Sequence, residues 1–190
     1  NATMRPDQAE GTYVKLEYGQ VKKFMSQIAV LCTSGVACDL FFEDFSSHYE
    51  MFPVDYVEHW ATTQMVSTEA ETDPAGCFGL SHYPHVLNRH NFFMQELISR
   101  RFRRAEQTMN WTPWSPEIRR RCEQFRTRRR RLGFSGDYFT QNAWFDDNQA
   151  AALRPFAVLF RDIQRDFWRE FQVQFSEEKS AFNKWETSMW

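Results

Sequence analysis

Two clusters of arginine are the residues in this sequence whose type and spacing most clearly suggest chemistry. One lies at residues 100–104 and the other at residues 126–131, and each is interrupted by a single other residue. A guanidinium group forms two parallel hydrogen bonds to a carboxylate or a phosphate, which a lysine cannot do. The clusters therefore predict contact with an anionic partner, made by Arg100, Arg101, Arg103, Arg104, Arg126, Arg128, Arg129, Arg130 and Arg131.

The clusters lie in the basic middle of a chain whose total charge is nearly balanced, at −2. Residues 1–80 carry a net charge of −8, residues 81–135 carry +9, and residues 136–190 carry −3. The acidic first 80 residues could neutralise the arginines inside the protein. Otherwise the arginines could bind an acidic protein surface, anionic lipid headgroups or RNA. Nucleic acid is the less favoured partner, because dedicated nucleic-acid binders are usually strongly basic.

A second group of residues has the chemistry of metal ligands. Cys77, His82, His85 and His90 lie close together in the sequence, and zinc is held by four such ligands in a tetrahedron. No Cys-x-x-Cys pair accompanies them, and Pro84 stiffens the backbone between two of the histidines. We expect no bound metal and no cofactor, with a small metal-binding protein or enzyme as an alternative.

No residue pattern typical of an enzyme active site is present in the sequence. The paired acids Glu43-Asp44 and Asp146-Asp147 are explained more simply as caps or solvated surface. The sequence contains neither a phosphate-binding glycine loop nor a nucleophile elbow, and its seven glycines argue against a nucleotide-binding fold. We therefore expect a protein that is not an enzyme.

Apolar residues recur at helical spacing through most of the chain, which predicts an all-α fold. The expected fold is an irregular bundle of about six helices, joined by long loops, in one domain over residues 1–190. The helices are expected from Val21 to Cys32, over 38–52, over 54–65, over 91–110, and from Ser115 to Gly133, with loops over 66–90 and from Gly133 to about Asp147.

The last helix is expected to run from Pro155 to near Trp185, because an aromatic residue recurs about every turn. Such a helix would be ~45 Å long, which is more than a compact bundle of this size needs. Its second half is therefore expected to anchor a partner. The anchoring residues would be Phe175, Phe182, Trp185 and Trp190, since aromatic residues and arginine are enriched at protein interfaces.

No segment is long and apolar enough to predict a transmembrane helix. The longest uncharged stretch covers residues 24–38, which is shorter than the ~20 apolar residues needed. The sequence begins with Asn1 and no signal-peptide pattern follows, so a targeting segment is expected to have been removed, unless the start is artificial.

The segment Leu159-Phe160-Arg161-Asp162-Ile163-Gln164-Arg165 resembles the signature of the Leu-Tyr-Arg family, with Phe in place of Tyr and with Ile and Gln in place of the following leucines. Members of that family are small mitochondrial helical proteins, including assembly factors and accessory subunits of respiratory complexes. The resemblance covers seven residues of 190 and lies near the C-terminal end, whereas the family's motif opens its first helix. The resemblance implies only that a mitochondrial location is slightly more favoured than it would be otherwise.

These observations together favour a non-catalytic accessory subunit of a large assembly. The expected place is peripheral to the mitochondrial inner membrane, in a respiratory-chain or ATP synthase complex, with other protein subunits and possible anionic headgroups as partners. The alternative is an RNA-binding ribosomal-type protein that uses the arginine-rich helices.

Overall fold

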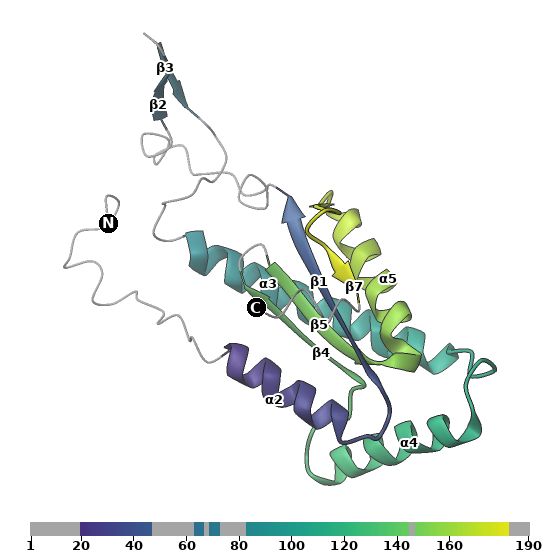
Figure 1. Cartoon of the computed structure of the whole chain (residues 1–190). Helices are drawn as coiled ribbons and strands as arrows, with labels where there is room; N and C mark the ends of the chain where they lie inside the picture. The colour runs from purple at the N-terminus through teal and green to yellow at the C-terminus, as the bar shows by residue number, and fades with distance from the viewer. Residues whose placement is uncertain (1–19, 47–62, 67–68, 73–82, 145–146, 183–190) are drawn as a thin grey trace.

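The protein is a mixed fold in which helices cover an antiparallel sheet (Figure 1), so the expected all-α bundle of about six helices is wrong. The computed structural model describes residues 20–46, 63–66, 69–72, 83–144 and 147–182. In chain order the elements are α2 (Gln20–Cys32), β1 (Cys38–Ser46), β2 (Thr63–Val66), β3 (Glu69–Thr72), α3 (Tyr83–Ala105), the 3-10 helix η3 (Glu106–Thr108), α4 (Pro116–Arg131), β4 (Phe139–Trp144), β5 (Asp147–Leu153), α5 (Arg154–Glu170), β6 (Gln174–Phe175) and β7 (Ala181–Phe182).

The sheet has the strand order β4-β5-β1, and both short C-terminal strands pair with the far edge of β1. All these pairs are antiparallel: Phe41 of β1 lies opposite Ala150 of β5, and β4 pairs with β5 from Phe139 opposite Ala152 onward. β6 and β7 pair with β1 near its end and its middle, respectively. β2 and β3 form a separate two-stranded hairpin.

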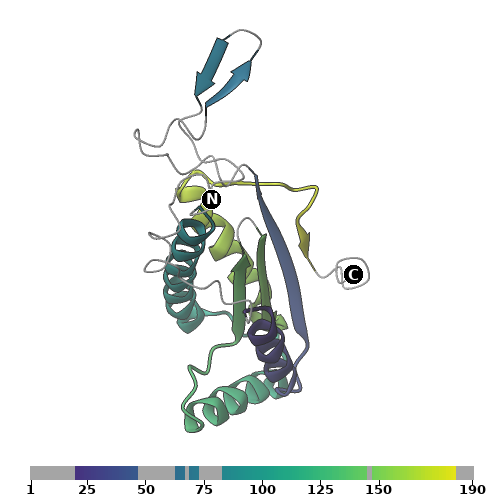
Figure 2. The ribbon, with the colours of Figure 1, turned by 90° about the vertical axis from the view of Figure 1, so that its left-hand side faces the viewer.

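Helices α3 and α5 pack on one face of the sheet, as Figure 2 shows. Alternate residues of a strand point to opposite faces, so the contacts of β4 define the two sides. Phe139 packs against Phe160 of α5, whereas the next residue, Thr140, hydrogen-bonds Gln27 of α2. Helix α2 therefore covers β4 on the opposite face from α3 and α5. Helix α4 crosses one end of the sheet (Figure 1).

The core is built from aromatic rings, as the abundance of Phe and Trp requires. Phe160 of α5 is fully buried, with ring centroids 5.8 Å from Phe41, 5.2 Å from Phe102 and 4.4 Å from Phe139. Three elements distant in the sequence therefore meet around one ring. Each such ring removes about 150–250 Å² from water, so burying these rings is a major part of what holds the layers together.

The segment expected as a helix over 38–52 is a strand over its described part, Cys38–Ser46. Its residues that face α5 alternate between apolar and acidic side chains: Phe41 and Phe45 are buried, and so are Asp39 and Glu43. Because acids occupy half of the buried face, the apolar residues of this strand do not recur at every second position. The phenylalanines alone have the spacing of one face of a helix, which is why the sequence predicted a helix. Arginines on α5 neutralise these acids, which local sequence cannot reveal.

The expected C-terminal helix from Pro155 to Trp185 is also wrong beyond Glu170. Helix α5 ends there, and Gln172 has a φ of 61°, the left-handed conformation that closes a helix. After the turn, Phe175 and Phe182 lie in β6 and β7 and pair with β1. The free edge of β1 offers backbone hydrogen bonds that the aromatic spacing does not indicate.

The expected loop between Gly133 and Asp147 contains the strand β4. This strand and β5 are rich in Asn, Gln and Ala, which are uncommon in strands, so propensity gave no signal. The helix expected over 91–110 begins earlier than predicted, at Tyr83. The helix expected over 54–65 is described only from Thr63 onward, and that part is the strand β2. The rest of that expected helix lies outside the described residues.

Two helix predictions are confirmed. Helix α2 ends before Gly35, which has a φ of 70°. Helix α4 begins at Pro116 after Ser115, whose side chain accepts a hydrogen bond from the Ile118 backbone N–H, and Gly133 follows its end with a φ of 80°. The cap residues and the glycines lie next to the helix ends that they mark, which is why the sequence alone predicted these two helices.

Candidate functional site: a cationic groove beside strand β4

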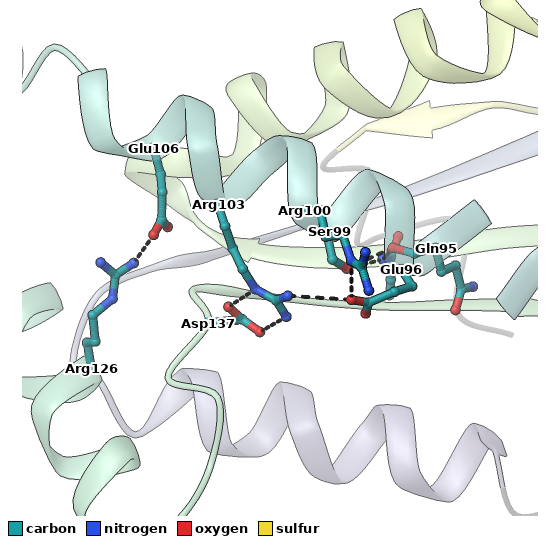
Figure 3. Close-up of polar contacts among 9 residues, drawn as sticks. Gln95, Glu96, Ser99, Arg100, Arg103, Glu106, Arg126 and Asp137 are labelled. Carbon is teal, nitrogen blue, oxygen red and sulfur yellow. Dashed lines mark hydrogen bonds and ion pairs between the residues drawn. The ribbon is translucent and has the colours of Figure 1, made fainter. Parts of the chain in front are cut away.

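The first arginine cluster lies on α3 and is largely neutralised by carboxylates. Arg100 donates to Glu96 over 2.9 Å, and Arg101 forms two hydrogen bonds to Glu170 at 2.6 and 2.7 Å. Arg103 forms a similar pair of bonds to Asp137, at 2.9 and 2.8 Å (Figure 3). Among these arginines, Arg104 is exposed and has no ion pair with any described residue.

The first part of α4 is neutralised in the same way. Arg119 pairs with Glu123, while Arg120 and Arg121 both pair with Glu117. Arg126 donates to Glu106 over 2.6 Å, and its guanidinium lies 3.9 Å from the centroid of the Tyr138 ring. Figure 3 shows this contact between the end of α3 and α4. Burial raises the pKa of Glu106, and the charge of Arg126 offsets part of that rise.

The last turn of α4 is different, because none of its four arginines pairs with a carboxylate in the described part of the chain. Arg128 donates to the Thr33 carbonyl and hydroxyl, at 3.1 and 2.9 Å. The guanidinium of Arg129 lies 4.7 Å from the centroid of the Phe134 ring, and Arg130 and Arg131 are exposed. The negative end of the helix dipole favours cations here, but by only about 0.3–1 kcal/mol each. Their charges are therefore available to a partner.

Only three acids of the first 80 residues, Asp39, Glu43 and Asp44, have described side chains, and none of them pairs with either arginine cluster. Within the described ranges, the acids of β1 pair with the C-terminal region: Asp39 with Arg154, Glu43 with Arg161 and Arg165, and Asp44 with Lys179. The basic middle of the chain is instead neutralised by neighbouring acids and by Asp137 and Glu170. Neither of these described sources reaches the last turn of α4.

Two adjoining cavities lie next to these free arginines. The first, of about 470 Å³, lies between α2 and α3 along β4, and the second, of about 620 Å³, lies between α2 and the end of α4. Lys23, Gln27, Val30 and Arg129 line both, so the two cavities form one groove. We refer to them together as the β4 groove.

The walls of the β4 groove are held in place by hydrogen bonds from β4 to both helices. Gln141 donates from Nε2 to the Gln95 carbonyl at 2.7 Å and to the Ser99 hydroxyl at 2.9 Å. On the other face, Thr140 donates to Gln27 of α2. These bonds fix the positions of α2 and α3 on either side of β4, so the groove is preformed.

The acidic side chains that line the groove are already neutralised. Burial alone would raise the pKa of Asp137, but hydrogen bonds from Arg103 and Ser135 lower it below its usual value. Arg103 also lies within 3.9 Å of Glu96, as Figure 3 shows. In contrast, Lys23 and Arg129 have no carboxylate partner within the described ranges. The net field of the groove is therefore positive and suits an anionic ligand.

The predicted aromatic anchors of the C-terminal region are used inside the protein, where they are described. Phe175 lies 5.6 Å from Phe45 of β1, and Phe182 lies 6.1 Å from Phe41, measured between ring centroids. Both are half-buried. The other two predicted anchors, Trp185 and Trp190, lie outside the described residues.

The metal-ligand group is mostly outside the described residues as well. Cys77 and His82 lie there, and the side chain of His85 is also not described. His90 is on α3, where burial lowers its pKa, and its ring centroid lies 5.9 Å from that of Trp168. Among the described residues, no group of three or more His, Cys, Asp or Glu side chains could hold a metal ion.

Sequence reasoning identified the arginines of the candidate site but missed the groove beside them. The groove depends on β4, whose polar residues Gln141 and Asn142 gave no strand signal.

Comparison of the chain with protein-family models gives no match, and comparison with curated protein sequences gives none either. Over the described ranges, no helix has both the length and the apolar character that crossing a membrane requires.

Proposed function

We propose that this protein is a non-catalytic accessory subunit of a multiprotein assembly, and that it binds an acidic surface of a partner protein through Arg128–Arg131. The observation that carries the proposal is the contrast along α4. The arginines from Arg119 to Arg126 have carboxylate partners within the chain, whereas the last four have none among the described residues. A row of guanidinium groups without carboxylate partners is typical of sites that bind carboxylates or phosphates.

A protein partner is favoured over RNA because of the charge of the whole chain. The net charge is −2 and the isoelectric point about 6.2, so there is no long-range attraction to a polyanion. The arginines also lie beside the exposed apolar side chains of Leu132 and Phe134, which are 67% and 54% exposed. Arginine next to apolar surface is characteristic of protein interfaces.

The test compares two variants that remove the same charge. In the first, Arg128, Arg129, Arg130 and Arg131 are all replaced by glutamine. In the control, four exposed arginines that already have carboxylate partners are replaced: Arg100, Arg119, Arg120 and Arg169. Surface pairs of this kind contribute little to stability, so both variants are expected to fold, which circular dichroism checks.

Each tagged chain is expressed in cells of its own source and sized in native extracts by gel filtration. We expect the wild type and the control to elute in a large particle, and the Arg128–Arg131 variant to elute as the free chain. Collapse of the particle on ribonuclease treatment would favour the RNA-binding alternative. A wild-type chain that elutes alone would refute the proposal. The mitochondrial location stays a prediction, which fluorescence microscopy of the tagged chain tests.

A further inference from the structure

We propose that the partner segment held by this protein is an extended acidic peptide, which adds to the sheet as a further strand along β4 in the β4 groove. The inference rests on the proposed function and names the ligand of the same surface. It concerns how the partner is bound, and it can fail while the role of Arg128–Arg131 stands.

The first observation is the position of β4 at the edge of the sheet. β4 pairs with β5 on one side, and on its other side no described strand pairs with it. The backbone N–H and C=O groups along such an edge form hydrogen bonds with any strand that is placed beside them. Peptide-binding domains use this mode, in which backbone bonds supply affinity and side-chain pockets supply specificity.

The second observation is that the first cavity of the β4 groove runs along this edge rather than over one face of the sheet. Four consecutive residues of β4, from Phe139 to Asn142, line the first cavity. Successive side chains of a strand point to opposite faces, so a cavity over one face would contact alternate residues. The contact with all four places the cavity beside the strand, with space for about four residues, or ~13 Å, of an added strand.

The third observation is that two buried polar side-chain atoms of β4 have no hydrogen-bond partner among the described residues. Asn142 is only 7% exposed, and its Nδ2 group forms no hydrogen bond with any described residue. The Oε1 atom of Gln141 is in the same condition. Buried polar groups are almost always satisfied, so β4 carries a donor and an acceptor, on its opposite faces, that the described residues leave unsatisfied at the edge of the sheet.

Charge indicates that this peptide is acidic. At one end the first cavity continues into the second, which is lined by Lys23, Arg128 and Arg129. The acids beside the groove, Glu96 and Asp137, are occupied by arginines of α3. A peptide carboxylate would therefore meet free cations without meeting free anions. Next to these cations, Leu132 and Phe134 line the second cavity and suit an apolar side chain of the same peptide.

Adjacent lysines of α2 provide a matched pair of variants. Lys23 lines both cavities, whereas Lys22 lines neither. Both side chains are exposed and neither forms an ion pair with a described residue. Lys23→Glu and Lys22→Glu therefore change the net charge equally and are expected to fold equally well, while only the first places an anion in the groove.

The probe is a phage-displayed library of random dodecapeptides selected on the full chain. We expect enriched peptides to be acidic with apolar residues at alternate positions. Lys23→Glu should weaken the best peptide at least tenfold, and Lys22→Glu less than twofold. Saturation with this peptide should slow hydrogen exchange of the Phe139 and Gln141 amides, which point away from β5, at least tenfold, and leave the amides of α4 unchanged.

The inference is overturned if no acidic peptide is enriched, or if the bound peptide protects another part of the chain. It is also overturned if the two lysine variants behave alike. Dimerisation in sedimentation that itself protects β4 would assign the edge to a second copy of the chain. Faster exchange of the β4 amides on deletion of residues 1–19 would assign it to the chain's own N-terminal segment. If only Arg128–Arg131 are needed for assembly, the proposed function stands without strand addition.

Discussion

Glutamine in place of Glu43 tests how much the buried ion cluster between β1 and α5 contributes to stability. The Glu43 side chain is fully buried and accepts three short hydrogen bonds: 3.0 Å from Arg161 Nε, and 2.8 and 2.7 Å from Arg165 Nε and Nη2. Arg165 also pairs with Glu177. The cluster therefore ties the centre of the sheet to α5 and to the segment between β6 and β7.

The expected loss follows from these contacts. Glutamine has the same shape and keeps one acceptor oxygen, but it removes the negative charge that faces two guanidinium groups. A hydrogen bond to a charged group is worth about 1 kcal/mol more than a neutral one, so the two bonds that the amide oxygen keeps lose about 2 kcal/mol together. The third bond is lost, because an amide nitrogen cannot accept it, which costs about 2 kcal/mol more and brings the expected loss to about 4 kcal/mol. This lies within the ~3–5 kcal/mol for breaking a buried pair, and Glu177 remains as a partner for Arg165.

The assay is urea unfolding at pH 7 followed by tryptophan fluorescence, since Trp168 lies in the core 4.6 Å from Phe45. In thermal unfolding, a loss of about 4 kcal/mol would lower the melting temperature by roughly 8–16 °C in a chain of this size. Glu170→Gln, which removes an exposed carboxylate that also pairs with arginine, is the control and should have a much smaller effect. A Glu43→Gln variant as stable as the control would refute the reasoning.

The same cluster predicts how stability depends on pH. Burial alone would raise the pKa of Glu43, but hydrogen bonds from Arg165 and Arg161 lower it below its ordinary value of 4.5. A lowered pKa means that the unfolded chain takes up the proton at a higher pH than the folded chain does. This part of the stability is therefore complete above about pH 4.5, and is lost as the pH falls from there through the lower folded pKa. The Glu43→Gln variant should lack this dependence of stability on pH.

Three further predictions concern local features of the fold. Ser115→Ala removes the cap of α4 and should cost about 1 kcal/mol in thermal unfolding, while Ser115→Asp should cost little; equal losses would contradict capping. Gly35→Ala should destabilise by more than ~1 kcal/mol, because φ is 70° and the new Cβ would lie 2.9 Å from an Arg121 nitrogen; unchanged melting would contradict strain. Iodoacetamide at pH 8 should label exposed Cys32 before Cys122, whose pKa burial raises to about 11, and peptide mapping that shows the reverse order would contradict this.

The candidate site shows where sequence reasoning succeeds and where it stops. The arginine runs were visible as composition, and so was their preference for carboxylates. Which arginines remain free was not visible, because the partners of Arg101 and Arg103 are Glu170 and Asp137, 69 and 34 residues away. The groove was not visible either, since its floor is a strand of polar residues that no pattern marks.

The sequence by itself determined the helices whose signals are local. Ser115 and Pro116 begin α4, and glycines follow the ends of α2 and α4, so each signal lies within a few residues of the helix end that it marks. The tertiary structure decided the sheet. β1 is a strand because Asp39 and Glu43 of its buried face meet Arg154, Arg161 and Arg165 of α5, more than 100 residues later. Burying an acid is costly without its counter-ion, so the conformation of β1 depends on residues that no local window contains.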